Sequence, residues 1–316
     1  MSHAQRLGRY VVESEEWLAA RQAGVGGSDV AAILGISPWV SPFALWHAKA
    51  GNIPAEVLTD EPVYWGKALE KVVLARWREE HPEHGAANWQ GYTWADRAQP
   101  WRHANPDFIA TSPTRSQHEI VEIKTSAYAD EWGPSGSDIV PPWYLTQLLW
   151  YLDILDARWG WLAVLIGGND YRSYRIDAHN HADDIAFIRA QAERFWQSVQ
   201  DGETPPIDGA DSTYRTIRKL HPDIDDEQIE IPADLAARLI ESKAAKEAAE
   251  ISWMQSLALA ADALGSAKTG TLGGLKIVGR RARQTREGEW GTPYVLLDRK
   301  AEANYQQYLE TSKESA

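Results

Sequence analysis

Apolar and charged positions alternate along Ile120–Lys124, which reads Ile-Val-Glu-Ile-Lys. Alternate side chains of a β-strand point to the same face of a sheet. Glu122 and Lys124 are therefore predicted to share one face, while Val121 and Ile123 point into a core. This pattern is typical of a strand with two opposite charges on one face and buried apolar side chains on the other.

A second strand is predicted at Phe108–Thr111, directly after Asp107. The spacer from Thr111 to Gln117 is rich in Ser, Thr and Pro, the composition of a turn. The two strands are thus expected to form a hairpin. That hairpin would bring Asp107 close to Glu122.

Helical periodicity predicts a helix over residues 63–80 and another from Pro142 to about Leu155. The first has an apolar stripe with i, i+3, i+4 and i+8 spacing, and Glu70 lies beside that stripe, where it either reaches a metal or is solvated. The second places Gln147 on one face with two tyrosines. The stripe consists of Leu69, Val72, Val73 and Trp77, and the tyrosines are Tyr144 and Tyr151.

Further elements follow from the same patterns. We expect helices at residues 11–23, 43–50 and 181–200, a strongly apolar strand at Trp159–Ile166, a Gly-Gly-Asn-Asp hairpin turn, and a returning strand at Tyr171–Ile176. Strands mixed with helices predict an α/β (α+β) fold, in which a mixed central sheet is flanked by helices.

Three glycines precede a short helix that Ser28 is predicted to cap, with Asp29 in its first turn. Arg21 lies seven residues before Ser28. A guanidinium beside a helix N-terminus suits a phosphate group. The same residues also fit a tight turn with a plain helix cap and a surface arginine.

A Pro-rich break at residues 204–209 predicts two domains, 1–203 and 204–316. The second is expected to contain a long helix from Pro232 to Leu264, a glycine-rich hairpin at 270–283, and a short helix at 301–308. The hairpin carries four basic residues that either contact phosphates or form a solvated ribbon or subunit contact: Lys276, Arg280, Arg281 and Arg283.

Composition excludes several classes of protein for this sequence. The chain has no cysteine, which excludes disulfides and thiolate metal sites. No apolar run reaches the roughly 18 residues of a membrane span, and the start of the sequence lacks the apolar region of a signal peptide. We therefore expect a cytoplasmic protein. The net charge of −13 disfavours a generally basic surface, but it permits a local basic groove.

Asp107, Glu122 and Lys124 together match the PD-(D/E)xK nuclease signature. Carboxylate oxygens hold Mg²⁺ with several waters left in its shell. The ion activates water and neutralises phosphate charge, and a lysine can orient that water or stabilise the transition state. The motif alone is equally typical of a solvated charged strand.

Over roughly residues 14–200 the chain resembles the lambda-exonuclease-like, YqaJ-type viral recombinase nucleases. Five segments match the family in order: Trp17–Gly35, Ser37–Gly51, Gly66 with Glu70, Asn105–Asp107 with Val121–Thr125, and Pro142–Tyr151. The part after about residue 210 resembles the family much less specifically.

The resemblance implies a role for each matching residue. Asp107, Glu122 and the Ile123 carbonyl would bind Mg²⁺, for which Mn²⁺ can substitute. Lys124 would assist the attacking water, while Glu70 and Gln147 would support the site. The 5′ phosphate of the DNA would be held by Arg21 and Ser28.

The implied activity is 5′-to-3′ exonuclease digestion of double-stranded DNA ends in a bacterial host cell, from a phage or prophage gene. A single-strand annealing protein is the implied partner, and some relatives form ring-shaped trimers. Two alternatives stay open. One is a structure-specific or restriction-like endonuclease. The other is a non-catalytic nucleic-acid-binding module. The presence of Glu70, Asp107, Glu122 and Lys124 disfavours it.

Overall fold

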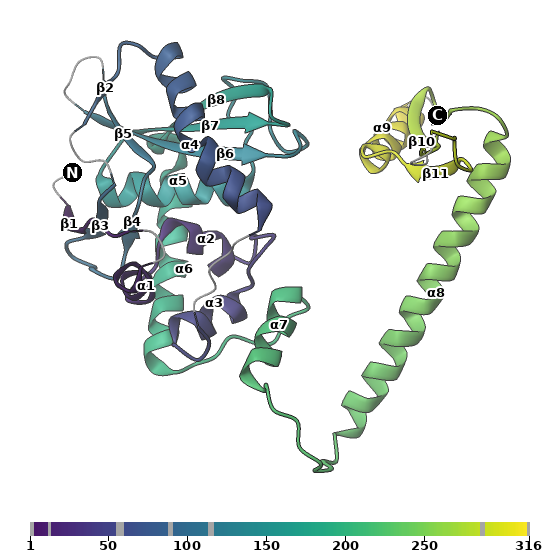
Figure 1. Cartoon of the computed structure of the whole chain (residues 1–316), viewed down its shortest axis with the longest axis horizontal. Helices are drawn as coiled ribbons and strands as arrows, with labels where there is room; N and C mark the ends of the chain where they lie inside the picture. The colour runs from purple at the N-terminus through teal and green to yellow at the C-terminus, as the bar shows by residue number, and fades with distance from the viewer. Residues whose placement is uncertain are drawn as a thin grey trace. The chain divides into compact units, whose positions relative to one another are not determined.

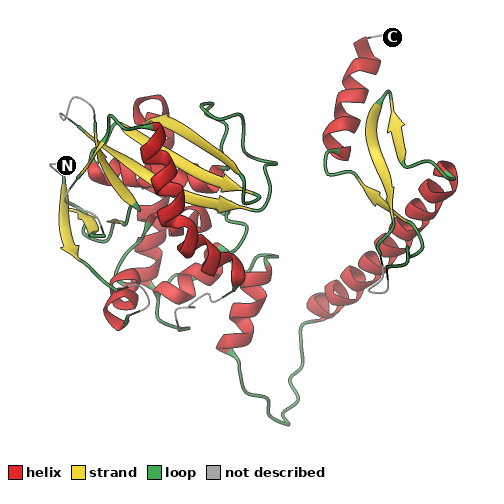
Figure 2. Ribbon diagram, turned by 45° about the horizontal axis from the view of Figure 1, so that its top comes forward, coloured by secondary structure: helices red, strands yellow, loops and turns green. Residues whose placement is uncertain are grey.

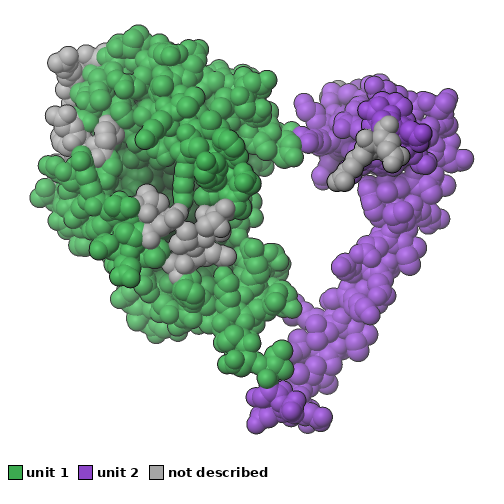
Figure 3. All heavy atoms as spheres, viewed as in Figure 1, with its two compact units in different colours: residues 1–224 green, residues 225–316 purple. Residues whose placement is uncertain are grey.

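The computed structural model describes residues 3–11, 14–54, 60–87, 91–112, 117–284 and 288–314. The chain divides into two compact units, residues 1–224 and 225–316 (Figure 3). The sequence break at 204–209 suggested an earlier boundary. Helix α7 (Asp211–Leu220) stays with the first unit because the Ser41 Oγ lies 2.6 Å from the Thr213 Oγ1, and the Ser41 N–H donates to Ser212.

A mixed sheet forms the centre of the first unit. Its strands, within the described residues, are ordered β2 (Gly85–Ala86), β5 (Phe108–Thr111), β6 (His118–Ser126), β7 (Trp159–Ile166) and β8 (Asp170–Asp177). Strands β6 and β7 are parallel, and the other pairs are antiparallel. The predicted fold class and the β5–β6 hairpin are confirmed, while the turn residues 113–116 lie outside the described residues.

Two helices cover the opposite faces of this sheet (Figure 1). Val121 and Ile123 point into a core, as the alternating pattern predicted, and helix α4 (Glu61–Glu80) packs on them. Helix α5 (Pro142–Leu155) packs on the other face and has the predicted bounds. The predicted apolar stripe of α4 was partly wrong: Val73 and Trp77 are buried, but Val72 is 59% exposed because it lies away from the sheet.

Smaller elements complete the first unit. Strands β1 (Ala4–Gly8), β3 (Thr93–Asp96) and β4 (His103–Ala104) form an antiparallel sheet. Helices α1 (Glu15–Gln22), α2 (Gly27–Ile33), α3 (Pro42–Lys49) and α6 (Ala182–Asp201) flank the core, with α2 and α6 against α5. In Figure 2 the strands of the central sheet lie between helices.

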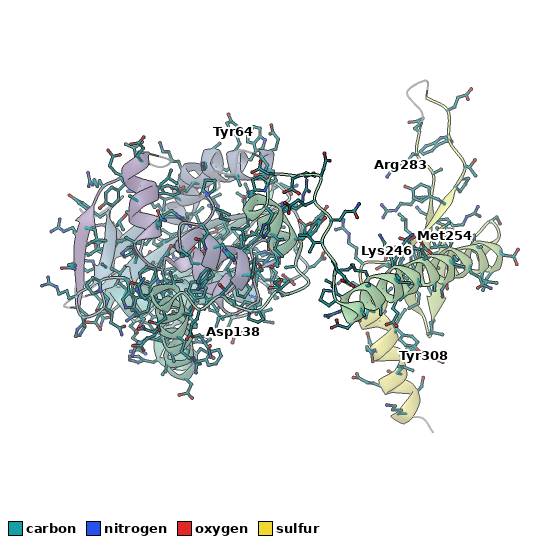
Figure 4. The ribbon with its side chains drawn as sticks, turned by 90° about the horizontal axis from the view of Figure 1, so that it is seen from below. Tyr64, Asp138, Lys246, Met254, Arg283 and Tyr308 are labelled. Atoms are coloured by element: carbon teal, nitrogen blue, oxygen red, sulfur yellow. The ribbon has the colours of Figure 1, made fainter. Side chains whose placement is uncertain are left out.

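The second unit consists of α8 (Ala233–Leu264), the antiparallel strands β9 (Thr269–Leu272), β10 (Leu275–Arg281) and β11 (Tyr294–Leu297), and α9 (Ala301–Glu314). No side chain of the 32 residues of α8 is buried, and Lys246 and Met254 project from it in Figure 4. Among the described residues, no helix combines the length and apolar character that a bilayer span requires.

Candidate active site

The hairpin fixes Asp107 against the neighbouring strand. Asp107 directly precedes β5, and its Oδ2 accepts a hydrogen bond of 2.7 Å from the Ile123 N–H on β6. A carboxylate held by a backbone amide loses little freedom when a ligand approaches. The structure therefore brings Asp107 to the stretch that contains Glu122 and Lys124.

Glu122 and Lys124 share the face of β6 that α5 covers. The Lys124 Nζ donates to the Glu122 Oε1 at 2.7 Å and to the Gln147 Oε1 at 3.1 Å. The Gln147 Nε2 donates to the same Glu122 oxygen at 2.6 Å. These three side chains thus form a closed triangle of hydrogen bonds, which fixes the rotamer of each.

Two tyrosines of α5 extend this triangle. The Lys124 ammonium lies 5.0 Å from the centre of the Tyr144 ring, and the Gln147 Nε2 donates to the Tyr151 hydroxyl at 3.2 Å. The face shared by Tyr144, Gln147 and Tyr151 was predicted from their helical spacing. An aromatic wall on this side limits the access of water to the lysine.

The surroundings of the two carboxyl groups disfavour their ionised forms. Burial and the neighbouring Asp107 raise the pKa of Glu122 to about 8. Burial also raises the pKa of Asp107. The Glu122 Oε2 is buried and has no hydrogen-bond partner among the described residues. An oxygen with these properties is an open position for a cation.

Lys124 remains a cation in this setting. Burial works to lower the pKa of Lys124, but the carboxylates of Glu122 and Asp107 outweigh burial, and the net pKa is raised. The lysine therefore offers a fixed positive charge and ammonium protons near any group that binds at Glu122.

Glu70 approaches the cluster from α4 and is half-buried. Burial raises its pKa first, Asp107 raises it further, and Lys124 acts in the opposite direction. Within the described residues, the oxygens of Glu70, Asp107 and Glu122 do not all lie within 4.8 Å of one another. Mg²⁺ commonly binds through one or two carboxylates and keeps several waters, so the donor set of Asp107 and Glu122 still fits this ion.

The glycine-rich turn has a different cap from the one predicted. The N-cap of α2 is Gly26, whose N–H donates to the Asp29 Oδ2 at 2.9 Å. The prediction of Ser28 as N-cap was wrong because the chain enters the helix two residues earlier. Ser28 instead accepts a hydrogen bond of 3.3 Å from Arg21, which also lies 3.4 Å from the Asp29 Oδ1.

Lys49 is a site residue that the sequence reasoning missed. Its buried ammonium lies 2.7 Å from the Asp29 Oδ2 and donates to the carbonyls of Arg21 and Gly24. Two cations, Arg21 and Lys49, thus face one anion, Asp29, and one positive charge is left over. A lysine in the last turn of a helix usually faces solvent, so its position gave no signal.

The glycine-rich turn and the cluster of Glu122, Lys124 and Gln147 are adjacent. A Cβ on Gly27 would lie 2.4 Å from the Tyr151 ring and 3.1 Å from the Gln147 Cγ, so only glycine lets α2 pack this closely on α5. A cavity of about 50 Å³ is lined by Arg21, Ser28 and Tyr151, among others. Tyr151 connects this cavity through Gln147 to Glu122.

The basic hairpin belongs to the second unit. Lys276 pairs with Asp298 at 2.6 Å, Arg280 donates to the Gly265 carbonyl at the end of α8, and the Arg283 Nε donates to the Tyr294 hydroxyl at 3.3 Å. These partners give the residues structural roles in the unit. Contact of the hairpin with phosphates stays a prediction from the sequence.

Pro106 and Asp107 directly precede strand β5, and Glu122, Ile123 and Lys124 lie on the neighbouring strand β6. This arrangement within a mixed sheet is that of a PD-(D/E)xK-type fold. Residues 16–158 match the YqaJ-like viral recombinase domain. The uncharacterized protein YqaJ of Bacillus subtilis (strain 168) is 30% identical over 252 residues, which span 77% of this chain and 74% of that protein. The chain belongs to the YqaJ-like viral recombinase family.

Solved structures show a more distant likeness. The alkaline exonuclease LHK-Exo from Laribacter hongkongensis aligns over 60% of this chain and 94% of its own, with 18% identity and a TM-score of 0.45. Its complex with dAMP aligns to the same extent.

Proposed function

We propose that this protein is a Mg²⁺-dependent exonuclease that digests linear duplex DNA from 5′ to 3′ and leaves single strands for phage-type recombination in a bacterial host. The buried, unpartnered oxygen of Glu122, held beside Asp107 and Lys124, is the observation that carries the proposal. A site of this composition suits phosphodiester hydrolysis.

Asp107, Glu122 and the carbonyl of Ile123 would hold the ion, and Mn²⁺ can substitute because it accepts the same oxygen ligands. Once bound, the ion would acidify a water molecule and neutralise charge on the scissile phosphate. Glu70 would act on the same centre from α4.

Lys124 supplies a positive charge and hydrogen-bond donors, neither of which an ionised carboxylate can provide. Its ammonium is fixed by Glu122 and Gln147, so it can orient the attacking water and stabilise the negative charge that develops on the phosphate. Gln147 is a positioning residue because it holds both Glu122 and Lys124 in place.

The pocket at the glycine-rich turn would bind the DNA end. Arg21 and Ser28 provide donors, and the excess positive charge over Asp29 favours an anion. A terminal phosphate carries more charge than an internal diester. Because this cavity adjoins the catalytic cluster through Tyr151, a phosphate bound there would place the first nucleotides near Glu122.

A substrate comparison tests the proposal. We expect 5′-phosphorylated linear duplex to be digested with Mg²⁺ but not with EDTA, while closed circular duplex stays intact. Nicking or linearisation of the circle would instead identify an endonuclease. A folded protein that cleaves neither substrate would be a non-catalytic binding module.

Arg21→Ala should remove most of the preference for a 5′-phosphorylated end by slowing only that substrate. Arg21→Lys should restore the preference in part, since lysine keeps the charge but not the planar fork of donors. The measurement compares initial rates on matched 5′-phosphate and 5′-hydroxyl duplexes at one salt concentration. The exposed Arg194→Ala serves as the control. Equal slowing of both substrates by Arg21→Ala would rule out an end clamp.

An annealing protein as partner and a ring-shaped trimer as assembly complete the proposal. Both rest on the sequence resemblance.

A further inference from the structure

A second cluster of titratable residues lies at the carboxyl end of α4, away from the catalytic residues. His81 ends the helix, and Glu83 and His84 follow it. Among the described residues, these three form a group whose ligand atoms all lie within 4.8 Å of one another. Nothing in the nuclease chemistry proposed above uses them.

The distances in this cluster suit one small cation. The Glu83 Oε1 lies 3.1 Å from the His84 Nδ1 and 3.7 Å from the His81 Nδ1. Ligand atoms bound tetrahedrally to zinc at about 2.0–2.1 Å are separated by roughly 3.3 Å. The two measured separations fall on either side of this value.

His84 is buried and incompletely satisfied. Its side chain is 5% exposed, and neither ring nitrogen has a hydrogen-bond partner among the described residues. The Nδ1 faces Glu83, and the Nε2 lies 3.3 Å from the Glu119 Oε2. Both nitrogens of this buried imidazole face carboxylates, but without good hydrogen-bond geometry, so one of them is available to a ligand.

Glu119 has the position of a supporting carboxylate. It is 2% exposed and is held by the Trp161 Nε1 at 2.6 Å and by Arg175 at 2.9 Å. Histidines that bind metals almost always donate their other ring N–H to a carboxylate or carbonyl group, which fixes the tautomer. Glu119 would hold the Nε2 proton of His84 and leave its Nδ1 free for a cation.

This cluster is separate from the catalytic centre. His81 lies eleven residues after Glu70, which corresponds to roughly 16 Å along α4. Glu119 and Glu122 are an odd number of residues apart on β6, so they point to opposite faces of the sheet. A ligand bound at one cluster therefore does not share side chains with the other.

We propose that His81, Glu83 and His84 bind a divalent cation of the zinc type, with Glu119 supporting His84. Two imidazoles and one carboxylate suit zinc, whereas Mg²⁺ prefers oxygen ligands alone. The ion would fasten the end of α4 to the sheet. There the centre of the His81 ring lies 4.2 Å from the centre of the Trp161 ring on β7.

Calorimetric titration of untagged protein with Zn²⁺ in saturating Mg²⁺ tests this site. The wild type should bind one equivalent, and His84→Ala should lose it. Glu119→Gln should weaken binding about 10- to 100-fold, as expected for a supporting carboxylate. The exposed His221→Ala should bind normally. Zn²⁺ should also raise the thermal unfolding midpoint of the wild type but not of His84→Ala.

Glu83→Gln keeps the test decisive if the buried His84 cannot be replaced without unfolding, because Glu83 is 47% exposed. It should bind Zn²⁺ more weakly while the protein stays folded. Unchanged titrations in Glu83→Gln and His81→Ala would overturn the proposal. So would loss of the Zn²⁺ equivalent in Asp107→Ala, since that would place the ion at the catalytic centre.

Discussion

Lys124→Ala should slow strand cleavage by on the order of 10²-fold or more while DNA affinity stays nearly unchanged. The lysine acts on charge that develops in the transition state, so its loss affects the chemical step more than ground-state binding. Its ammonium is held at 2.7 Å from Glu122 and 3.1 Å from Gln147, which leaves little freedom to lose on reaction.

Single-turnover digestion of linear duplex and a separate binding titration without metal would measure the two quantities. Lys243→Ala, which removes an exposed lysine of α8, is the matched control and should behave as wild type. Near-normal digestion by folded Lys124→Ala protein would remove Lys124 from the mechanism.

Asp107→Ala and Glu122→Ala should each weaken Mg²⁺ binding and abolish most cleavage. Even a residue that only supports a metal ligand changes affinity by about 10- to 100-fold, so loss of a ligand itself should cost at least as much. Calorimetric titration with Mg²⁺ and then Mn²⁺ provides the measurement. Unchanged affinity in both variants would place the metal elsewhere.

The affinity for Mg²⁺ should also depend on pH in a direction set by Glu122. In the metal-free protein, burial and Asp107 raise the pKa of Glu122 to about 8, so the group is protonated below that pH. A cation needs the ionised carboxylate, and binding must release the proton. Apparent Mg²⁺ affinity should therefore rise as pH increases towards about 8 and level off above it. Glu122→Gln should flatten this dependence.

Local patterns in the sequence were enough to predict the central part of the fold. The alternation in Ile120–Lys124 assigned Val121 and Ile123 to one face of β6 and Glu122 and Lys124 to the other, and the apolar runs of α5 and β7 gave their bounds. The runs of α5 and β7 are 14 and 8 residues long and mostly apolar, so they stand out from the polar segments around them. Strands β1 and β11 were missed because they have only five and four residues. Helix α7 is clearly amphipathic, and its pattern could have predicted it.

The pocket proposed to bind the DNA end was harder to predict because it depends on contacts between distant segments. The ion pair of Asp29 with Lys49 forms only when α2 and α3 pack together. The identity of the helix cap was likewise decided by Asp29, which reaches back to Gly26. Sequence spacing showed that Arg21 and Ser28 were near one another, but not which other charges would surround them.

The position of β6 inside the sheet has a consequence for how the molecule comes apart. Strand β6 is paired with β7 over eight successive residues, from Glu119 with Trp159 to Ser126 with Ile166, and β5 covers its other edge. Fraying begins at termini and weakly packed segments, whereas central strands open only with the whole domain. A slip of one residue would also turn Glu122 and Lys124 into the apolar layer beneath α4. The proposed catalytic residues Glu122 and Lys124 thus lie on a central strand, and activity and fold are expected to be lost together on heating.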